Sequence, residues 1–153
     1  MLTGTTLIAI QSLMYMVQRG DEDHFSPADI APALGASPTY LSKVNTQLVK
    51  AGILQAHRGM KGGVSLARNP KQINLLEIVE AVQGKILGDY CTEYSNVARV
   101  CGYHHAMHEI QEALVGTLRK WTLDDLLQRP GPNAALDELV NCKMACARNM
   151  AEN

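Results

Sequence analysis

The chain has 153 residues, a formal net charge of −1 and 46% hydrophobic residues, which fits one domain with a small appendage. No apolar run approaches the ~20 residues of a membrane span, and no basic stretch leads into an apolar signal core at the N-terminus. These properties argue against a membrane protein, so we expect no membrane contact and a cytoplasmic location.

The small net charge hides a basic central region. The 47 residues between Asp29 and Glu77 contain no carboxylate but six basic side chains, which are Lys43, Lys50, Arg58, Lys61, Arg68 and Lys71. A solvated face normally mixes both signs of charge, so a one-sided field of this kind favours a polyanionic partner.

The first segment with helical character is residues 5–19. It is apolar on most sides, which is typical of a buried helix, and Gly20 with the acidic run after it ends the segment.

Two further helices follow in close succession. Ser26 and Pro27 predict the cap and first residue of a short helix that Gly35 ends, and Ser37 repeats the signal for a helix over 38–51. This second helix has an apolar inner face and a polar, basic outer face made of Thr39, Tyr40, Ser42, Lys43, Gln47 and Lys50. Two helices at this separation predict a helix-turn-helix, with an ordinary helical hairpin as the alternative.

The next segment predicts a β-hairpin. Residues 53–57 and 64–67 have strand character, and the turn between them, RGMKGG, is glycine-rich and basic. A hairpin directly after a helix-turn-helix is a wing, which favours DNA binding. No helix follows the glycines, so the turn is not a nucleotide-binding loop.

The second half begins with a capping box. Asn74 and Glu77 predict the start of a helix through residue 82, whereas residues 84–102 show no periodicity. A long helix resumes near Tyr103, with an apolar stripe of Met107, Ile110, Leu114 and Leu118.

The C-terminal region predicts two more helices. Thr122 and Asp125 form another capping box for a short helix that ends at Gln128. A Pro- and Gly-containing linker follows, and residues 134–149 predict a terminal helix.

The order and wording of these parts resemble one family. The stretches FSPADIAPALGASPTYLSKVNTQLVKAGILQAHRGMKGGVSLARNPKQINLLEIVEAVQG and CGYHHAMHEIQEALVGTLRKWTLDDLL are similar to the IscR/NsrR/CymR family of winged-helix regulators, across roughly residues 1–129. The wing, RGMKGGVSLAR, is the most specific part. The resemblance implies a dimeric DNA-binding repressor or activator whose sensor loop often ligates an iron–sulfur cluster.

We therefore expect a mainly α fold with a small β-hairpin wing. A winged helix-turn-helix DNA-binding domain at 1–83 would be followed by a cysteine-bearing sensor loop at 84–102 and a dimerisation helix region at 103–129. A C-terminal linker and helix at 130–153 would complete the chain.

We expect the DNA contacts on the helix 38–51, in a major groove, and on the wing. The candidate contact residues are Ser37, Thr39, Tyr40, Ser42, Lys43, Gln47, Arg58, Lys61 and Gly62. For Tyr40 the alternative is packing against the base of the wing, and for Ser42 and Lys43 it is a solvated face.

Four cysteines stand at positions 91, 101, 142 and 146, and without a secretory signal they do not suggest a disulfide framework. The resemblance carries two loop ligands over to Cys91 and Cys101, and a histidine ligand of some members to His104. The family's middle loop cysteine is missing, since residues 92–100 read TEYSNVARV.

Three interpretations of the cysteines stay open. The first is an iron–sulfur cluster held by Cys91, Cys101 and His104, with the two-iron type favoured because histidine can replace cysteine at one iron. Zinc is a variant of it, and the second-choice ligands are His108, Cys142 and Cys146. The others are a metal-free thiol redox sensor and inert cysteines without any cofactor.

The sequence thus predicts a homodimeric, sequence-specific transcription regulator on double-stranded DNA, interpreted as a repressor, whose affinity follows a cluster, metal or thiol state. The alternative is a metal- or cluster-binding protein that acts through a protein partner without binding DNA. No nucleophile is paired with a base and an oxyanion donor, so we expect no enzyme.

Overall fold

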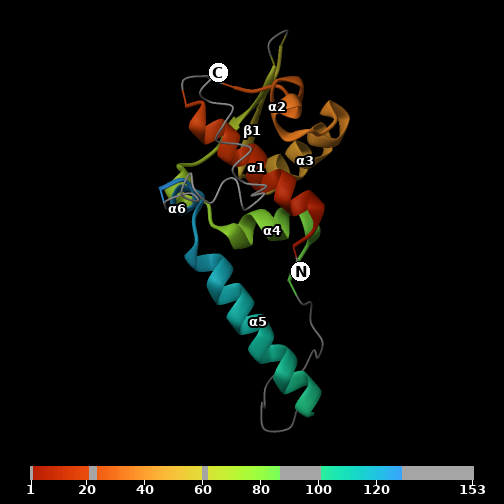
Figure 1. Ribbon diagram of the computed structural model, residues 1–153, viewed down its shortest axis with the longest axis vertical. Helices are drawn as coiled ribbons and strands as arrows, with labels where there is room; N and C mark the ends of the chain where they lie inside the picture. The colour runs from red at the N-terminus through yellow and green to blue at the C-terminus, as the bar shows by residue number, and fades with distance from the viewer. Residues whose placement is uncertain (1, 21–23, 60–61, 87–100, 129–153) are drawn as a thin grey trace, which may run out of the picture.

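The computed structural model describes residues 2–20, 24–59, 62–86 and 101–128. Figure 1 shows the elements, which in chain order are α1 Gly4–Gln18, α2 Pro27–Leu34, α3 Pro38–Lys50, β1 Leu54–His57, β2 Gly63–Leu66, the 3₁₀ helix η1 Pro70–Gln72, α4 Leu75–Gln83, α5 Gly102–Lys120 and α6 Leu123–Gln128. The prediction of a mainly α fold with one small antiparallel hairpin is confirmed. Within these residues no helix has the length and apolar character that crossing a membrane requires.

Helix α1 lies at the centre of the fold. Thr3 caps it, and the helix contacts α2, α3, α4, α6 and β2. One hydrophobic cluster forms around it, and its fully buried large side chains include Leu13, Ile30, Leu41, Leu48, Ile53, Ile73, Ile78 and Leu123. The prediction that residues 5–19 form a buried helix is confirmed.

Helices α2 and α3 begin with the predicted caps. The Ser26 hydroxyl accepts a hydrogen bond from the backbone amide of Asp29 at 3.3 Å, and the Asp29 carboxylate accepts one from the Ser26 amide at 2.8 Å. Pro32 lies inside α2, which is only eight residues long, and Gly35 ends it with a φ of 59°. Ser37 also caps α3 through its hydroxyl, without the reciprocal carboxylate that Asp29 supplies at α2. The helix-turn-helix is therefore formed by local cap and stop signals.

The wing is tied to the segment before α2. Strands β1 and β2 pair antiparallel, with Leu54 opposite Leu66, and the backbone of Phe25 exchanges two hydrogen bonds of 2.9 Å with Val64. A Cβ on Gly63 would collide with the Phe25 carbonyl group. Glycine is required here because a third stretch of backbone lies against the hairpin.

Helices α4 and α6 start from the two predicted capping boxes. The Asn74 side chain accepts from the Glu77 amide at 3.0 Å, and the Thr122 hydroxyl accepts from the Asp125 amide at 3.2 Å. The two helix starts are joined, because residues 74 and 122 form an isolated β-bridge. The fully buried Leu123 therefore brings α6 back onto the core around α1.

Helix α5 leaves this body. Figure 1 shows it as one long helix whose C-terminal end joins α6 at the body and whose N-terminal end points away. None of its 19 residues is buried, and Tyr103 and Ile110 are 62% and 48% exposed. Of the predicted stripe, Met107, Leu114 and Leu118 are half-buried. The helix begins one residue before the predicted position.

Several predictions lie outside the described residues. They are Lys61 at the wing tip, Cys91 with most of the segment 84–102, the linker after Gln128, and the terminal helix with Cys142 and Cys146. The 3₁₀ helix η1 between the wing and α4 was not predicted.

We predict that Gly63→Ala destabilises the fold by about 1–3 kcal/mol, the usual cost of inserting an atom where no space exists. Thermal unfolding followed by circular dichroism measures the effect. Gly4→Ala is the matched control, because a Cβ there meets nothing within 4 Å. Equal unfolding midpoints for the two variants would contradict the close approach of Phe25 to the wing.

Candidate nucleic-acid interface and cysteine site

The outer face of α3 is open to solvent. All six side chains predicted on this face, Thr39, Tyr40, Ser42, Lys43, Gln47 and Lys50, are exposed, while Leu41, Val44 and Leu48 are buried. Thr46, which sequence reasoning had not singled out, is also exposed, and its hydroxyl donates to the Ser42 carbonyl at 2.8 Å. The helix thus presents a polar surface with two lysines and no carboxylate.

The start of α3 is held from two sides. The Ser37 hydroxyl accepts from the Tyr40 backbone amide at 3.2 Å, so this oxygen serves as the helix cap. The Tyr40 hydroxyl donates to Thr5 Oγ1 in the first turn of α1 at 2.8 Å. The hydroxyl is therefore held by α1 and not by the base of the wing, which was the alternative considered for Tyr40. The ring remains 37% exposed beside the outer face.

The described part of the wing supplies one cation and a tight turn. Arg58 is exposed at the end of β1. The Gly62 amide donates to the Gly59 carbonyl at 2.9 Å, and a Cβ on Gly62 would lie 2.7 Å from the His57 carbonyl oxygen. Gly62, predicted as a DNA contact, thus has a structural reason to be glycine. The His57 ring contacts the Ser65 hydroxyl at 2.7 Å and stacks on His24.

One of the six basic side chains is already paired within the chain. Arg68 Nη2 donates to Glu77 Oε1 at 2.9 Å, and Arg68 Nη1 donates to the Gln72 carbonyl at 3.3 Å. Glu77 lies just outside the acid-free stretch. Counting the charged residues within that stretch could therefore not show that Arg68 is paired. The field available to a polyanion comes from the remaining lysines and Arg58.

The described cysteine, Cys101, stands at the start of α5. Its Sγ lies 2.9 Å from Nδ1 of His104, and both residues are at the end of α5 that points away from the body. The pKa of the Cys101 thiol is lowered, first by the backbone amide of His104 and then by its ring. A lowered pKa increases the thiolate fraction at neutral pH, and the thiolate is the form that ligates metals and reacts with oxidants.

The described residues fit part of a metal or cluster site. Thiolate sulfur and imidazole nitrogen are donors that iron and zinc accept, and His108 follows His104 by one helical turn. In the ranges that the structure describes, no three His, Cys, Asp or Glu side chains gather around one point. Ligation by Cys91, Cys142 or Cys146 therefore stays a prediction.

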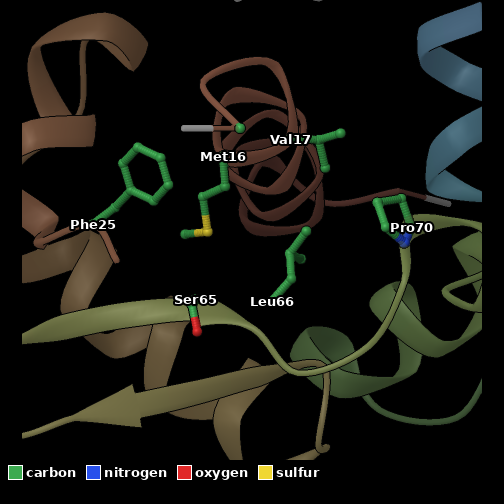
Figure 2. A pocket seen from close by; sticks show the side chains of 7 residues that line it. Met16, Val17, Phe25, Ser65, Leu66 and Pro70 are labelled. Atoms are coloured by element: carbon green, nitrogen blue, oxygen red, sulfur yellow. The ribbon is translucent and has the colours of Figure 1, made fainter. Parts of the chain in front are cut away.

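A pocket of about 260 Å³ lies between the C-terminal end of α1 and the wing. Figure 2 shows Met16 and Val17 of α1 above Leu66 of β2, with Phe25 and Pro70 at the two sides. In the described part of the chain its lining includes one polar side chain, that of Ser65. The pocket has no donors for a cluster and no charge for a phosphate, so it belongs to neither candidate site.

Comparison with known proteins identifies the family of the chain. The model of the Rrf2 family, described as iron-dependent transcriptional regulator, matches residues 2–129. Protein aau3 of Rhizobium meliloti (strain 1021) is 31% identical over 140 residues, which cover 88% of this chain and 90% of that protein. The HTH-type transcriptional regulator NsrR of Geobacillus kaustophilus (strain HTA426) is 31% identical over 131 residues, or 83% of this chain and 89% of NsrR.

The fold is similar to that of CymR, the global cysteine regulator of B. subtilis. The TM-score is 0.68 at 20% sequence identity, and the match covers 86% of this chain and 98% of CymR. At this identity the similarity shows the fold alone, which is the winged helix. The family match and two relatives over most of their length agree with it: the chain belongs to the Rrf2 family of DNA-binding transcriptional regulators and is not an enzyme.

Proposed function

We propose that this chain is a homodimeric repressor that reads duplex DNA in the cytoplasm, and that a cysteine site at the start of α5 controls its affinity. The outer face of α3 carries the proposal. It is exposed, polar and free of carboxylates, while the inner face of the same helix is fixed in the core. Such a helix can enter a major groove without losing its packing.

The proposed DNA contacts fall into two classes. Thr39, Ser42, Lys43 and Gln47 project from α3, where side chains reach base edges and supply sequence specificity. Lys50, Arg58 and Lys61 would neutralise phosphates and fix the register on the duplex.

The exposed helix α5 supports the proposal of a homodimer. Reading two half-sites of one operator needs a two-fold dimer. Most of the stability of a protein helix comes from packing its amphipathic face, and α5 buries none of its residues within the described chain. We propose that the stripe of Met107, Ile110, Leu114 and Leu118 packs against the same stripe of a second copy.

The geometry of Cys101 and His104 supports the proposal of a sensor. Cys91, Cys101 and His104 would hold an iron–sulfur cluster, which would supply reactivity toward oxidants. Zinc is the second candidate and has no redox chemistry of its own. The chain's own contribution is the lowered pKa of Cys101, which favours the thiolate. A thiol sensor without metal would use the same thiolate.

We predict a steep salt dependence of DNA binding. A dimer that neutralises about six phosphates gives log K falling with log salt at a slope near −5. Lys50→Ala should reduce the magnitude of that slope by about 2 for the dimer, whereas Arg68→Ala should leave it unchanged because Glu77 already matches the Arg68 charge. Gel shifts at several salt concentrations measure both slopes.

Lys43→Ala should relax sequence preference, because Lys43 is proposed to reach a base edge, and Lys61→Ala should weaken binding to all sequences alike. A flat slope in the wild-type protein would contradict DNA binding and favour action through a protein partner. Equal effects of both variants on operator and random DNA would mean that the recognition surface lies elsewhere.

We predict that Leu114→Asp converts the dimer to monomers, because the interface would then bury an unpaired charge. Sedimentation velocity measures the change. Gly116→Asp is the matched control, since it places the same charge on the opposite side of α5, where a Cβ meets open space. A dimer from Leu114→Asp would place the interface on another surface.

We predict that protein isolated without oxygen contains iron, and that Cys91→Ala and Cys101→Ala each abolish it and change operator affinity. Cys142→Ala should matter only if the terminal segment supplies a ligand. Absorption spectra with iron and zinc analysis make the measurement. Colourless, metal-free protein that binds its operator equally before and after thiol oxidation would contradict sensing by these cysteines.

A second measurement tests the Cys101–His104 pair directly. In metal-free protein whose other cysteines are serines, the pH midpoint of Cys101 alkylation should lie below the ordinary thiol value of 9.0, because the pKa of this thiol is lowered. His104→Ala should raise the midpoint and slow alkylation at pH 7, since less thiolate is then present.

A further inference from the structure

The end of α4 and the start of α3 are both hydrogen-bonded to the first turn of α1. Oε1 of Gln83, the last residue of α4, accepts from the Thr6 hydroxyl at 2.7 Å and from the Thr3 backbone amide at 3.3 Å. The Tyr40 hydroxyl at the start of α3 donates to Thr5 Oγ1 at 2.8 Å. Helices α3 and α4 are thus joined to the start of α1 through Thr3, Thr5 and Thr6.

The donors and acceptors of this network are determined. The Thr3 amide can only donate, so the atom of Gln83 that faces it is the carbonyl oxygen, and the Thr6 hydroxyl must donate to that oxygen as well. The Thr3 hydroxyl, 3.0 Å from the Thr6 oxygen, then donates to it. Thr6 has no exposed surface, so water does not readily replace Gln83 as its acceptor.

Gln83 also stands where the cysteine-bearing segment begins. Gly84 follows it with a φ of 82° and ends α4, and Cys91 comes eight positions after Gln83. Helix α4 itself contacts α1, α3 and α5. A displacement of the chain beyond Gly84 therefore acts first on Gln83.

We propose that Gln83 is a positioning residue that couples the cysteine site to the recognition helix through the first turn of α1. The inference rests on the proposed function, which supplies the signal. When Gln83 withdraws, the buried Thr6 hydroxyl loses its acceptor and the first turn of α1 must rearrange. Thr5 belongs to that turn and holds Tyr40, so the change reaches the first turn of α3, where base contacts are made.

The first test uses the isolated protein without DNA. Gln83→Met keeps the length of the side chain and removes the acceptor. Amides of residues 38–44 should then exchange with deuterium about fivefold faster, the factor that one ordinary hydrogen bond contributes. Gln83→Glu should restore the wild-type rate, because a carboxylate accepts both bonds. Gln72→Met, at an exposed position on η1, is the matched control and should change nothing.

The second test measures the coupling itself. The operator Kd is determined for protein reconstituted with ferrous iron and sulfide without oxygen, and again after the metal is removed with a chelator. Gln83→Met and Thr5→Val should each bring the ratio of the two Kd values toward one, and the double variant should bring no further change. A purely structural role would alter both Kd values equally and leave their ratio unchanged.

The two proposals fail in different ways. A wild-type protein that does not bind DNA, or whose ratio is one, would overturn the proposed function. A wild-type ratio far from one that Gln83→Met leaves unchanged would overturn the coupling role alone. Unchanged exchange over residues 38–44 in Gln83→Met would overturn the link between α4 and α3 whatever metal the protein holds.

Discussion

The burial of α1 is the constraint on which the rest of the fold depends. The helix has no charged residue between its first and last positions, so the chain must cover it on most sides. Helices α2, α3, α4 and α6 and strand β2 do so, and each buries one face against the core. Leu41, Val44 and Leu48 turn inward on α3, where each buried side chain contributes about 1.5–3 kcal/mol. The outer face of α3 is exposed because the inner face of the same helix packs into the core around α1.

The position of α5 limits how the signal proposed for the cysteine site could reach α3. A helix of 19 residues is about 28 Å long. Its C-terminal end joins the body, where the Leu75 amide donates to the Trp121 carbonyl at 2.9 Å. Cys101 and His104 stand at the other end (Figure 1). Within one chain, the proposed signal would pass either along α5 or through the segment that follows Gln83, whose Oε1 accepts a hydrogen bond from Thr6 in the first turn of α1.

Local signals in the sequence predicted the caps that start the helices, and most predicted helix and strand ends lie within one residue of the observed ones. Capping boxes join positions three apart, so Ser26, Asn74 and Thr122 announce the helices that follow them. The same spacing joins Cys101 to His104, which the family resemblance had marked as ligands.

Contacts between distant residues were not predictable in this way. Gln83 and Thr6 are 77 positions apart, and Tyr40 and Thr5 are 35 apart. Their pairing depends on how three helices pack, and threonine or glutamine at a helix end is ordinary. The burial of Asn45 was also not predicted, because its side chain is polar. The helical period nevertheless places it on the inner face of α3.

The carboxylates at the two ends of the acid-free stretch make contacts within the protein itself. Asp29 and Glu77 stand at the two ends of the acid-free stretch, and each lies in the first turn of a helix. Each carboxylate accepts a hydrogen bond from a backbone amide there, as Asp125 does at α6. A negative charge at this end offsets the helix dipole. The pKa of Asp29 is lowered by its hydrogen bonds with Ser26, which keeps it ionised in the cap. Glu77 also pairs with Arg68. Asp29 and Glu77 are thus engaged within the protein, while the outer face of α3 carries no carboxylate.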